Sequence, residues 1–518
     1  MNEHFLSICV AQHGKLRRSH TALVDGAGRL TWGELTRQVE RAASAMHAAG
    51  LQHGDRVGQL LANGRDALVV ALATWHLGCV GVPLSPLLTP DQMSGLLADA
   101  EVKGFIAGAP YGDIARAVRM SAGTKKFAIG FADQEFIDWL QCLEEAPEEL
   151  EPFVGLAGND EASIIYSSGT TGTPKGIVHS LAARQHMAVA LALALRFDDR
   201  SVALVATPLA SNATWTMILP TLLLGGTLIW IPMFSPSGWM TAMVEHDVTH
   251  AFCVPVMLQA MLAAPGFEGF KAPQLRMLVS AGSALPARVR QEVTARLGPV
   301  IFELYGCTEG IGTVATPEMP EDKTGCVGQA LPGAEIAILD SEGRFAASGV
   351  PGEVIGRSPA LMDGYRRRPD ATAEVLWTAP DGRVWLRTGD IGVLDEEHYL
   401  TLKDRVKDMI VSGGLNVYPA DIECVLAQRD DLLESSVIGI RHDKWGEVPA
   451  AIIRVKPEAS VSTDELMNWV NARVAKHQRL AVVWIANQPL PRNVLGKVLK
   501  RELRSELSDR LQTQLARA

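Results

Sequence analysis

Apolar and polar residues alternate at helical and strand spacings through about the first 285 residues of the chain. Thr31-Trp-Gly-Glu34 has the pattern of a capping box, and apolar residues follow it at helical spacing until Gly50 predicts the end of a helix. The stretch 54–61 then has the composition of a strand, and similar pairs of helix and strand recur. This alternation predicts parallel sheets covered by helices.

The pattern changes twice in the C-terminal part. From Gly325 to Leu402, glycines, prolines and short alternating runs predict a small antiparallel β region. After Asp408, helices and strands of a different character predict a separate small α+β domain. The expected elements there are a helix over 419–426, strands over 437–440 and 450–455, and a helix that begins at Ser462 with Glu465. The predicted fold class is α/β, with a large N-terminal domain of parallel αβ subdomains plus a small β region, followed by this small C-terminal α+β domain.

Composition places the chain among ordinary globular proteins. Its 518 residues are too many for one hydrophobic core, so division into domains is expected. A formal net charge of −10 argues against a nucleic-acid partner. The seven cysteines are scattered, without a C-x-x-C pair, as expected of reduced thiols in the cytoplasm. No charged n-region with an apolar h-region opens the sequence, so a secretory signal is not expected. The oligomeric state stays open.

One uncharged segment, residues 201–244, is long enough to suggest a membrane span. Its most apolar part runs from Trp215 to Phe234. Prolines and a glycine pair divide it into pieces of helix and strand length: Pro208, Pro220, Gly225-Gly226 and Pro232. Buried elements of a large α/β core explain these pieces better, so no stable membrane insertion is predicted.

The most informative segment is Ser163-Ile-Ile-Tyr-Ser-Ser-Gly-Thr-Thr-Gly-Thr-Pro-Lys-Gly-Ile177. A short apolar run predicts a buried strand, and the ten residues after it include three glycines, five hydroxyl side chains and one lysine. Backbone N–H groups, hydroxyls and an ammonium together can hold polyphosphate oxygens. The order differs from a Walker A motif, because Pro174 and Gly176 flank the lysine and no helix is expected to follow. By composition alone, a surface loop without a ligand is the alternative.

The order of these residues resembles the signature of the adenylate-forming superfamily, which includes acyl-CoA synthetases, adenylation domains of peptide synthetases and firefly luciferase. Four further segments resemble the other motifs of that family, in the family's order. They are Phe302-Glu-Leu-Tyr-Gly-Cys-Thr-Glu-Gly310, Leu386-Arg-Thr-Gly-Asp-Ile-Gly392, Lys403-Asp-Arg-Val-Lys-Asp-Met-Ile-Val-Ser-Gly-Gly-Leu-Asn416 and Pro491-Arg-Asn-Val-Leu-Gly-Lys-Val-Leu-Lys-Arg501. The resemblance implies a boundary between an adenylation domain, residues 1–406, and a mobile domain, residues 407–518.

The resemblance implies an ATP-dependent ligase that converts a carboxylic acid into an acyl-adenylate and releases pyrophosphate. Two anions must meet in that step, so catalysis depends on positioning and positive charge. Lys497 is the expected catalytic cation, Glu309 the expected Mg²⁺ ligand, and Thr171 a phosphate-contacting catalytic residue. A solvated surface lysine is the alternative for Lys497, and an ordinary loop carboxylate is the alternative for Glu309.

The nucleotide is assigned by resemblance to residues from several segments. The residues expected to bind the phosphates are Ser167, Ser168, Gly169, Thr170, Thr171, Gly172, Thr173, Lys175 and Thr308. Tyr305 is expected to stack on the adenine. The other residues expected around the adenine are Ala281, Gly282, Ser283, Glu303, Leu304 and Gly306. Asp390 is expected to accept hydrogen bonds from the ribose hydroxyls, with support from Arg405. Without the family resemblance, Tyr305 would more often be interpreted as a core residue. The sequence Thr-Gly-Asp, which ends at Asp390, would be interpreted as a common turn.

Lys407 occupies the family's hinge position, although a surface lysine without a hinge function is the alternative. A rotation there would withdraw Lys497 and bring Gly413 and Gly414 toward an incoming thiol. Trp445 lies where some CoA ligases pack the CoA adenine, so coenzyme A is the expected acceptor.

Two departures from the family pattern affect the predicted thiol channel. Ser211 stands where a histidine is usual, and His477-Gln-Arg-Leu480 replaces a Tyr-Lys-x-Pro segment. An amine acceptor, which would make the chain an amide-forming ligase, therefore remains the second candidate. A luciferase-like oxidation has no specific support, and a degenerate nucleotide-binding regulator is the non-enzymatic alternative.

The acyl pocket is expected to be apolar and of moderate size. The segments that build it in the family supply Asn212, Trp215, Met217, Val254 and Ile311, and no Arg or Lys occurs in them to hold a dicarboxylate. The aspartate that grips an α-amino group in amino-acid-activating members is absent near Asn212. An aryl, alicyclic or medium-chain carboxylic acid is therefore predicted.

Overall fold

The computed structural model describes residues 5–147, 156–167, 174–413, 415–492 and 498–515. The chain divides into two compact units. The first contains residues 1–322, 328–335 and 356–386, and the second contains residues 323–327, 336–355 and 387–518. The predicted boundary at residue 407 lies inside the second unit, and the mobility of residues 407–518 stays a prediction.

Two large sheets form the first unit, and both are parallel in their centres. The nine-stranded sheet runs in the order β16 (Gln329–Ala330), β15 (Gly312–Ala315), β14 (Ile301–Gly306), β13 (Met277–Ala281), β12 (His250–Cys253), β10 (Val202–Val205), β11 (Thr227–Trp230), β1 (Thr21–Asp25) and β2 (Gly28–Thr31). The eight-stranded sheet runs in the order β19 (Gly364–Tyr365), β9 (Lys175–Ser180), β8 (Glu161–Ser167), β4 (Val80–Pro83), β3 (Arg56–Leu60), β5 (Gly104–Gly108), β6 (Lys125–Ile129) and β7 (Ile137–Asp138). Antiparallel strands occur only toward the ends of both sheets among the described residues, as in β8–β9 and β14–β15.

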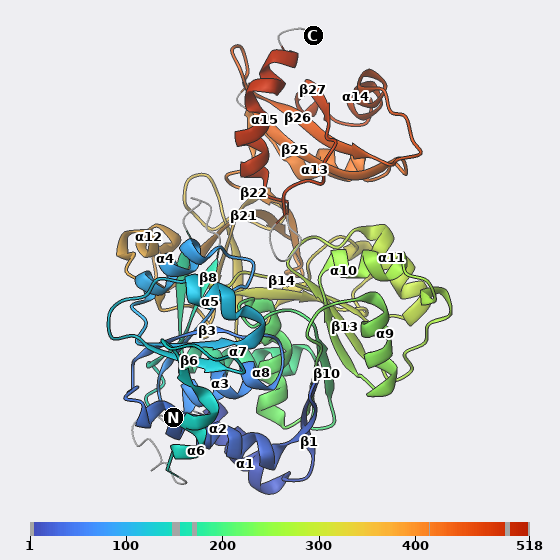
Figure 1. The fold of residues 1–518 in the computed structure, drawn as a ribbon. Coiled ribbons are helices and arrows are strands. Elements are labelled where there is room, and N and C mark those ends of the chain that lie inside the picture. The colour runs from blue at the N-terminus through green and yellow to red at the C-terminus, as the bar shows by residue number, and fades with distance from the viewer. Residues whose placement is uncertain (1–4, 148–155, 168–173, 414, 493–497, 516–518) are drawn as a thin grey trace. The chain divides into compact units, whose positions relative to one another are not determined.

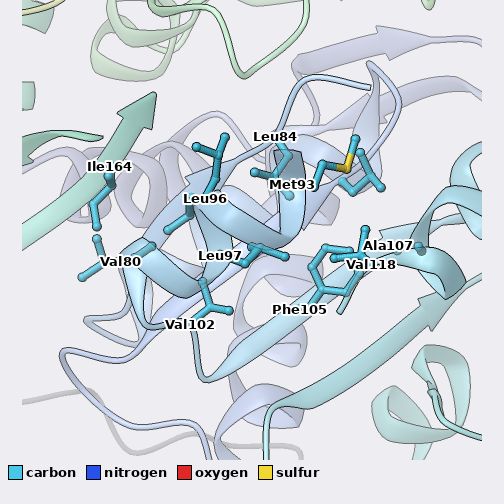
Figure 2. Close-up of a cluster of buried hydrophobic side chains, with 14 of the residues drawn as sticks. Val80, Leu84, Met93, Leu96, Leu97, Val102, Phe105, Ala107, Val118 and Ile164 are labelled. Atoms are coloured by element: carbon cyan, nitrogen blue, oxygen red, sulfur yellow. The ribbon is translucent and has the colours of Figure 1, made fainter. Parts of the chain in front are cut away.

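Helices cover these sheets, as the sequence pattern predicts (Figure 1). The α-helices of the first unit are α1 (Phe5–Leu16), α2 (Trp32–Ala48), α3 (Arg65–His76), α4 (Pro90–Ala100), α5 (Gly112–Ala117), α6 (Trp139–Glu145), α7 (Leu181–Ala194), α8 (Trp215–Leu224), α9 (Pro236–Glu245), α10 (Pro255–Leu262), α11 (Ala287–Leu297) and α12 (Pro369–Val375). The capping box predicted for α2 is present, with Thr31 and Glu34 bonded reciprocally. Apolar side chains of α4, including Leu96 and Leu97, meet those of β4, β5 and β8 in one buried cluster (Figure 2).

Helices α7 and α8 form a layer between the two large sheets. Helix α7 packs against β8 and β9, α8 packs against β10, β11 and β12, and the two helices pack on each other. The uncharged segment therefore forms buried core elements, as predicted, and no helix in the described part of the chain has the length and apolarity to span a membrane. The prediction that Pro220 interrupts this segment is wrong, because Pro220 lies inside α8. Proline removes one helical hydrogen bond, and packing on both sides of α8 compensates for that loss.

The predicted antiparallel β region is a five-stranded sheet. It has the order β17 (Glu335–Leu339), β18 (Gly352–Arg357), β21 (Val384–Leu394) and β20 (Leu376–Thr378), with β22 (Leu400–Arg405) also paired to β21. The C-terminal sheet has the order β24 (Leu415–Val417), β23 (Ile410–Ser412), β26 (Gly446–Val455) and β25 (Leu432–His442), with β27 (Val482–Ile485) paired to β26. Its helices are α13 (Pro419–Leu426), α14 (Thr463–Asn471) and α15 (Lys500–Leu515). Ser462 caps α14 as predicted.

Candidate functional site

The β8–β9 hairpin positions the predicted phosphate-binding segment. Ser167 ends β8 and pairs with Lys175, the first residue of β9. A strand rather than a helix follows Lys175, as the flanking proline and glycine predict. The phosphate-contacting residues predicted between Ser167 and Lys175 lie outside the described residues. They are Ser168, Gly169, Thr170, Thr171, Gly172 and Thr173. The structure therefore describes the two ends of this segment, at Ser167 and Lys175.

Lys175, Tyr365 and Glu309 form one cluster at these ends, which we call the Tyr365 cluster. The Lys175 ammonium lies 4.7 Å from the centre of the Tyr365 ring, within the range of a cation–π contact. The Tyr365 hydroxyl donates a hydrogen bond of 2.8 Å to Oε1 of Glu309. Burial, followed by the charge of Glu309, raises the pKa of Tyr365, so the phenol keeps its proton and acts as the donor. The cluster brings the predicted metal ligand next to the predicted phosphate segment.

The backbone around Glu309 is fixed by the segment 360–362. The Met362 N–H donates to the carbonyl oxygen of Glu309 at 2.8 Å. Gly310 has a φ of +109°, and a Cβ at this position would lie 2.0 Å from the carbonyl oxygen of Ala360. Only glycine fits this close approach of two backbones.

The surroundings of Glu309 fit a hard cation that is shared with phosphate. The described residues contain no group of three or more His, Cys, Asp or Glu side chains that could form a complete metal cage. One oriented carboxylate suits Mg²⁺, which usually keeps several waters and binds through one or two carboxylates together with substrate phosphates. Tyr365 contacts only Oε1 in the described structure, so Glu309 still offers acceptor lone pairs for such an ion.

The residues expected around adenine come together at the carboxyl ends of β13 and β14. These strands are parallel, with Ser280 beside Glu303 and Ala281 beside Leu304. Gly282 and Ser283 follow β13 directly, and Tyr305 and Gly306 end β14. The Glu303 carboxylate pairs with Arg290 and accepts from the Leu285 N–H, so its charge is already compensated within the protein. Burial nevertheless raises the pKa of Glu303.

Asp390 and Arg405 lie side by side in the second unit. They are register partners on β21 and β22, and Nε of Arg405 lies 3.1 Å from Oδ1 of Asp390. Asp390 is buried, with 9% of its surface exposed. The two residues are thus in contact, and the roles of Asp390 and Arg405 toward a ribose stay predictions.

Lys407 lies in a turn, residues 406–408, between β22 and β23. The next residue, Asp408, is buried and pairs with Arg504 of α15 at 2.9 Å. This ion pair ties the end of the turn to the C-terminal helix. Lys497, the predicted catalytic lysine, lies outside the described residues, and the flanking residues Arg492 and Val498 pair as an antiparallel bridge.

Two of the residues predicted on the CoA side, Gly413 and Trp445, are in contact. The Gly413 N–H donates to the carbonyl oxygen of Trp445 at 2.8 Å. Gly413 has a φ of +58°, and a Cβ there would lie 2.8 Å from Cε3 of the indole. Trp445 remains 46% exposed, with the Lys444 ammonium 4.8 Å from the centre of its ring. Gly414 lies outside the described residues.

The predicted acyl-pocket residues include a neighbour that the sequence analysis missed. Arg184 of α7 donates to Oδ1 of Asn212 at 2.7 Å, and its guanidinium lies 5.5 Å from the centre of the Trp215 ring. The segments predicted to form the pocket contain no Arg or Lys, and this cation comes instead from α7, which packs alongside α8. Trp215, Met217, Val254 and Ile311 are buried, as an apolar pocket wall would be.

His179 links this region to the predicted nucleotide site. Its Nε2 donates to the carbonyl oxygen of Thr308 at 2.7 Å, because that oxygen can only accept. Burial, reinforced by the charge of Arg184, lowers the pKa of His179 well below its usual value, so the ring is neutral. On the other side of the ring, Nδ1 has no hydrogen-bond partner among the described residues.

With this geometry established, comparison with known proteins assigns the family. Residues 10–366 match the family model of the AMP-binding enzymes, and residues 421–497 match the AMP-binding enzyme C-terminal domain. The chain belongs to this family, in the adenylate-forming superfamily and of the acyl-CoA synthetase type.

Individual relatives align with this chain over nearly their whole length. The long-chain-fatty-acid–CoA ligase FadD13 of Mycobacterium tuberculosis is 34% identical over 485 residues, which cover 93% of each chain. The ATP-bound structure of MatB from Rhodopseudomonas palustris has a TM-score of 0.88 at 28% identity, covering 98% of this chain and 99% of that one. The amide bond synthetase McbA from Marinactinospora thermotolerans has a TM-score of 0.86 at 25% identity, covering 97% and 99%. The chain is thus an ATP-dependent, AMP-forming acid ligase.

Proposed function

We propose that this enzyme activates a carboxylic acid as its acyl-adenylate and then transfers the acyl group to the thiol of coenzyme A. The observation that carries the first step is the Tyr365 cluster, which joins an ammonium and an oriented carboxylate at the ends of the predicted phosphate segment. FadD13 is itself named a CoA ligase, which supports the thiol acceptor.

The proposed first step joins two anions. A carboxylate oxygen of the acid attacks the α-phosphorus of ATP, the bond from that phosphorus to the bridging oxygen breaks, and pyrophosphate leaves. The Lys175 ammonium adds positive charge beside the β8–β9 segment, and Glu309 would hold Mg²⁺, which supplies charge neutralisation to the phosphates when bound. Lys497 is proposed to contact the carboxylate and the α-phosphate during this step.

The proposed second step uses a different arrangement of residues 407–518. The thiol sulfur attacks the acyl carbon, the bond from that carbon to the AMP oxygen breaks, and the thiol proton passes to solvent. We propose that rotation about Lys407 withdraws Lys497 and presents the Gly413–Trp445 contact to the pantetheine arm and adenine of CoA. The exposed indole offers the adenine a stacking surface.

An amide-forming reaction is the second candidate, and specific observations favour it. McbA, an amide bond synthetase, has a closely similar fold. The Oγ atom of Ser211, at the position of the usual histidine, is buried and has no hydrogen-bond partner among the described residues.

A product analysis separates the two acceptors. The full chain is incubated with ATP, Mg²⁺ and a panel of carboxylic acids, and pyrophosphate release is followed with CoA, with an amino-acid and amine panel, or with neither. Mass spectrometry then identifies thioester or amide. Thioester formation supports the proposal, amide formation in its place supports the second candidate, and absence of pyrophosphate release with every acid would refute both.

A further inference from the structure

Arg184 carries a buried charge that no acidic side chain in the described structure compensates. Its side chain is fully buried, and its hydrogen-bond acceptors are neutral: Oγ of Ser163 at 2.8 and 3.0 Å, Oδ1 of Asn212 at 2.7 Å, and the Met187 sulfur at 3.7 Å. Buried charges are normally paired, because removing them from water is costly. Burial lowers the pKa of Arg184 to about 9, which still leaves the guanidinium charged at neutral pH.

The neighbouring groups orient this guanidinium without neutralising it. Ser163 and His179 face each other as register partners on β8 and β9. His179 is neutral and already donates to Thr308, so it supplies no negative charge. Asn212 and Trp215 contribute only an amide oxygen and a ring face. An anion from outside the protein would complete the site.

The position of Arg184 indicates where that anion would come from. On one side, Arg184 donates to Ser163, which is the register partner of His179. His179 in turn donates to the carbonyl oxygen of Thr308, the residue before the predicted metal ligand. On the other side lie Asn212 and Trp215, two residues of the predicted acyl pocket. A charge between the predicted reaction centre and the predicted acyl pocket is placed to contact the organic acid rather than the solvent.

We propose that Arg184 binds a second carboxylate of the acyl substrate, so that the enzyme activates one carboxylate of a dicarboxylic acid while Arg184 holds the other. This inference rests on the proposed function. The contacts with Ser163, Asn212 and Met187 use four of the five N–H groups of the guanidinium. The fifth can donate a charge-assisted hydrogen bond to a carboxylate oxygen, and the attraction between the two charges adds to it. The sequence predicts an aryl, alicyclic or medium-chain monocarboxylic acid. The proposed substrate keeps this apolar body and adds a second carboxylate at the end opposite the reacting one.

The test compares acids that differ only in the second carboxylate. Thioester formation is measured for dicarboxylates of four to eight carbons and for benzenedicarboxylates, each beside its monocarboxylate of equal length or ring. For at least one pair, the wild-type enzyme should show the higher kcat/KM with the dicarboxylate. In Arg184→Met and Arg184→Gln that ratio should fall by about 10- to 100-fold, the range expected for hydrogen bonds to a charged group. Arg184→Lys should recover part of it.

Controls separate binding from folding. Arg276→Met removes an exposed arginine that pairs with Asp198, and it should leave the ratio unchanged. If the neutral variants of Arg184 fail to fold, the inference is tested by the kcat/KM ratios of the wild type and of Arg184→Lys. A wild-type preference for monocarboxylates in every pair, or equal losses for both acids in folded variants, would overturn the inference while leaving the proposed function intact. Absence of pyrophosphate release with every acid would instead refute the proposed function.

Discussion

The Tyr365 hydroxyl donates a 2.8 Å hydrogen bond to the Glu309 carboxylate, and so a residue from β19 orients the predicted metal ligand in the β14–β15 turn. Fifty-five residues separate the two positions in sequence, and β19 reaches the site because it pairs with β9. Tyr365 thereby acts as a positioning residue, since it holds Glu309 rather than the reacting atoms.

Tyr365→Phe should lower the rate of pyrophosphate release about tenfold, because a hydrogen bond to a charged group is lost. Since Glu309 would lose its orientation, the Mg²⁺ concentration for half-maximal rate should rise. Tyr166→Phe is the matched control, because Tyr166 of β8, in the same sheet as Tyr365, donates to Asp99 of α4 at 2.8 Å. The control should reduce stability without shifting the Mg²⁺ requirement. An unchanged Mg²⁺ requirement in Tyr365→Phe would contradict the positioning role.

Lys497→Ala should abolish acyl-adenylate formation and leave thioester formation from preformed acyl-AMP largely intact, because the lysine charge is needed only where two anions meet. Each half-reaction is assayed separately, the first by pyrophosphate release and the second by supplying acyl-AMP with CoA. Arg510→Ala, which removes an exposed basic residue of α15, should affect neither. Equal losses in both half-reactions of Lys497→Ala would argue against the assignment.

Lys407→Pro should slow the second half-reaction at least tenfold more than the first, because a fixed φ restricts rotation at the turn. Single-turnover measurements of adenylate formation and of its consumption by CoA give the two rates. Glu458→Pro, in another turn of the second unit, serves as the control and should leave their ratio unchanged. A uniform loss in Lys407→Pro would show that the turn is structural rather than a hinge.

Gly413→Ala should raise the KM for CoA several-fold while adenylate formation continues. The added Cβ would lie 2.8 Å from the Trp445 ring, and the φ of +58° is strained for alanine. Gly343→Ala tests backbone strain alone, because Gly343 also has a positive φ but no atom within 4 Å of the added Cβ. If both variants behave alike toward CoA, the contact with Trp445 is not the cause.

Acid should destabilise the fold through His250. Burial lowers the pKa of His250 to about 4, with Nε2 donating to the Leu195 carbonyl at 3.1 Å. The unfolded chain therefore binds the proton more tightly than the folded one. The resulting stability is complete above pH 6.5 and is lost as the pH falls toward 4. This group alone should lower the free energy of unfolding by roughly 2 kcal/mol between pH 7.5 and 5.

Urea unfolding of the wild type and of His250→Gln at these two pH values measures that contribution. The variant should show a smaller decrease between pH 7.5 and 5, whatever its absolute stability. His20→Gln, at an exposed position, should keep the wild-type decrease. Equal decreases in wild type and His250→Gln would contradict the prediction.

Local patterns predicted much of the fold. The capping box of α2, the strand before the phosphate segment, α13 and the Ser462 cap follow from side chains close together in sequence. Pro220 is the exception, because tertiary packing holds it inside α8. The motifs predicted that Arg405 lies near Asp390, and the structure places the two in contact. Gly413 and Trp445 were predicted separately on the CoA side, and the structure adds the contact between them.

The sequence by itself determined the family, the order of the motifs and the kinds of side chain available for chemistry, because these depend on residue identity and spacing. Only the tertiary structure revealed Tyr365 beside Glu309 and Arg184 beside Asn212. Strand pairing and the packing of α7 on α8 bring these distant residues together, and hydrophobic periodicity does not encode such pairings. An arginine in the mostly apolar α7 was the available signal, but its partners depend on long-range packing.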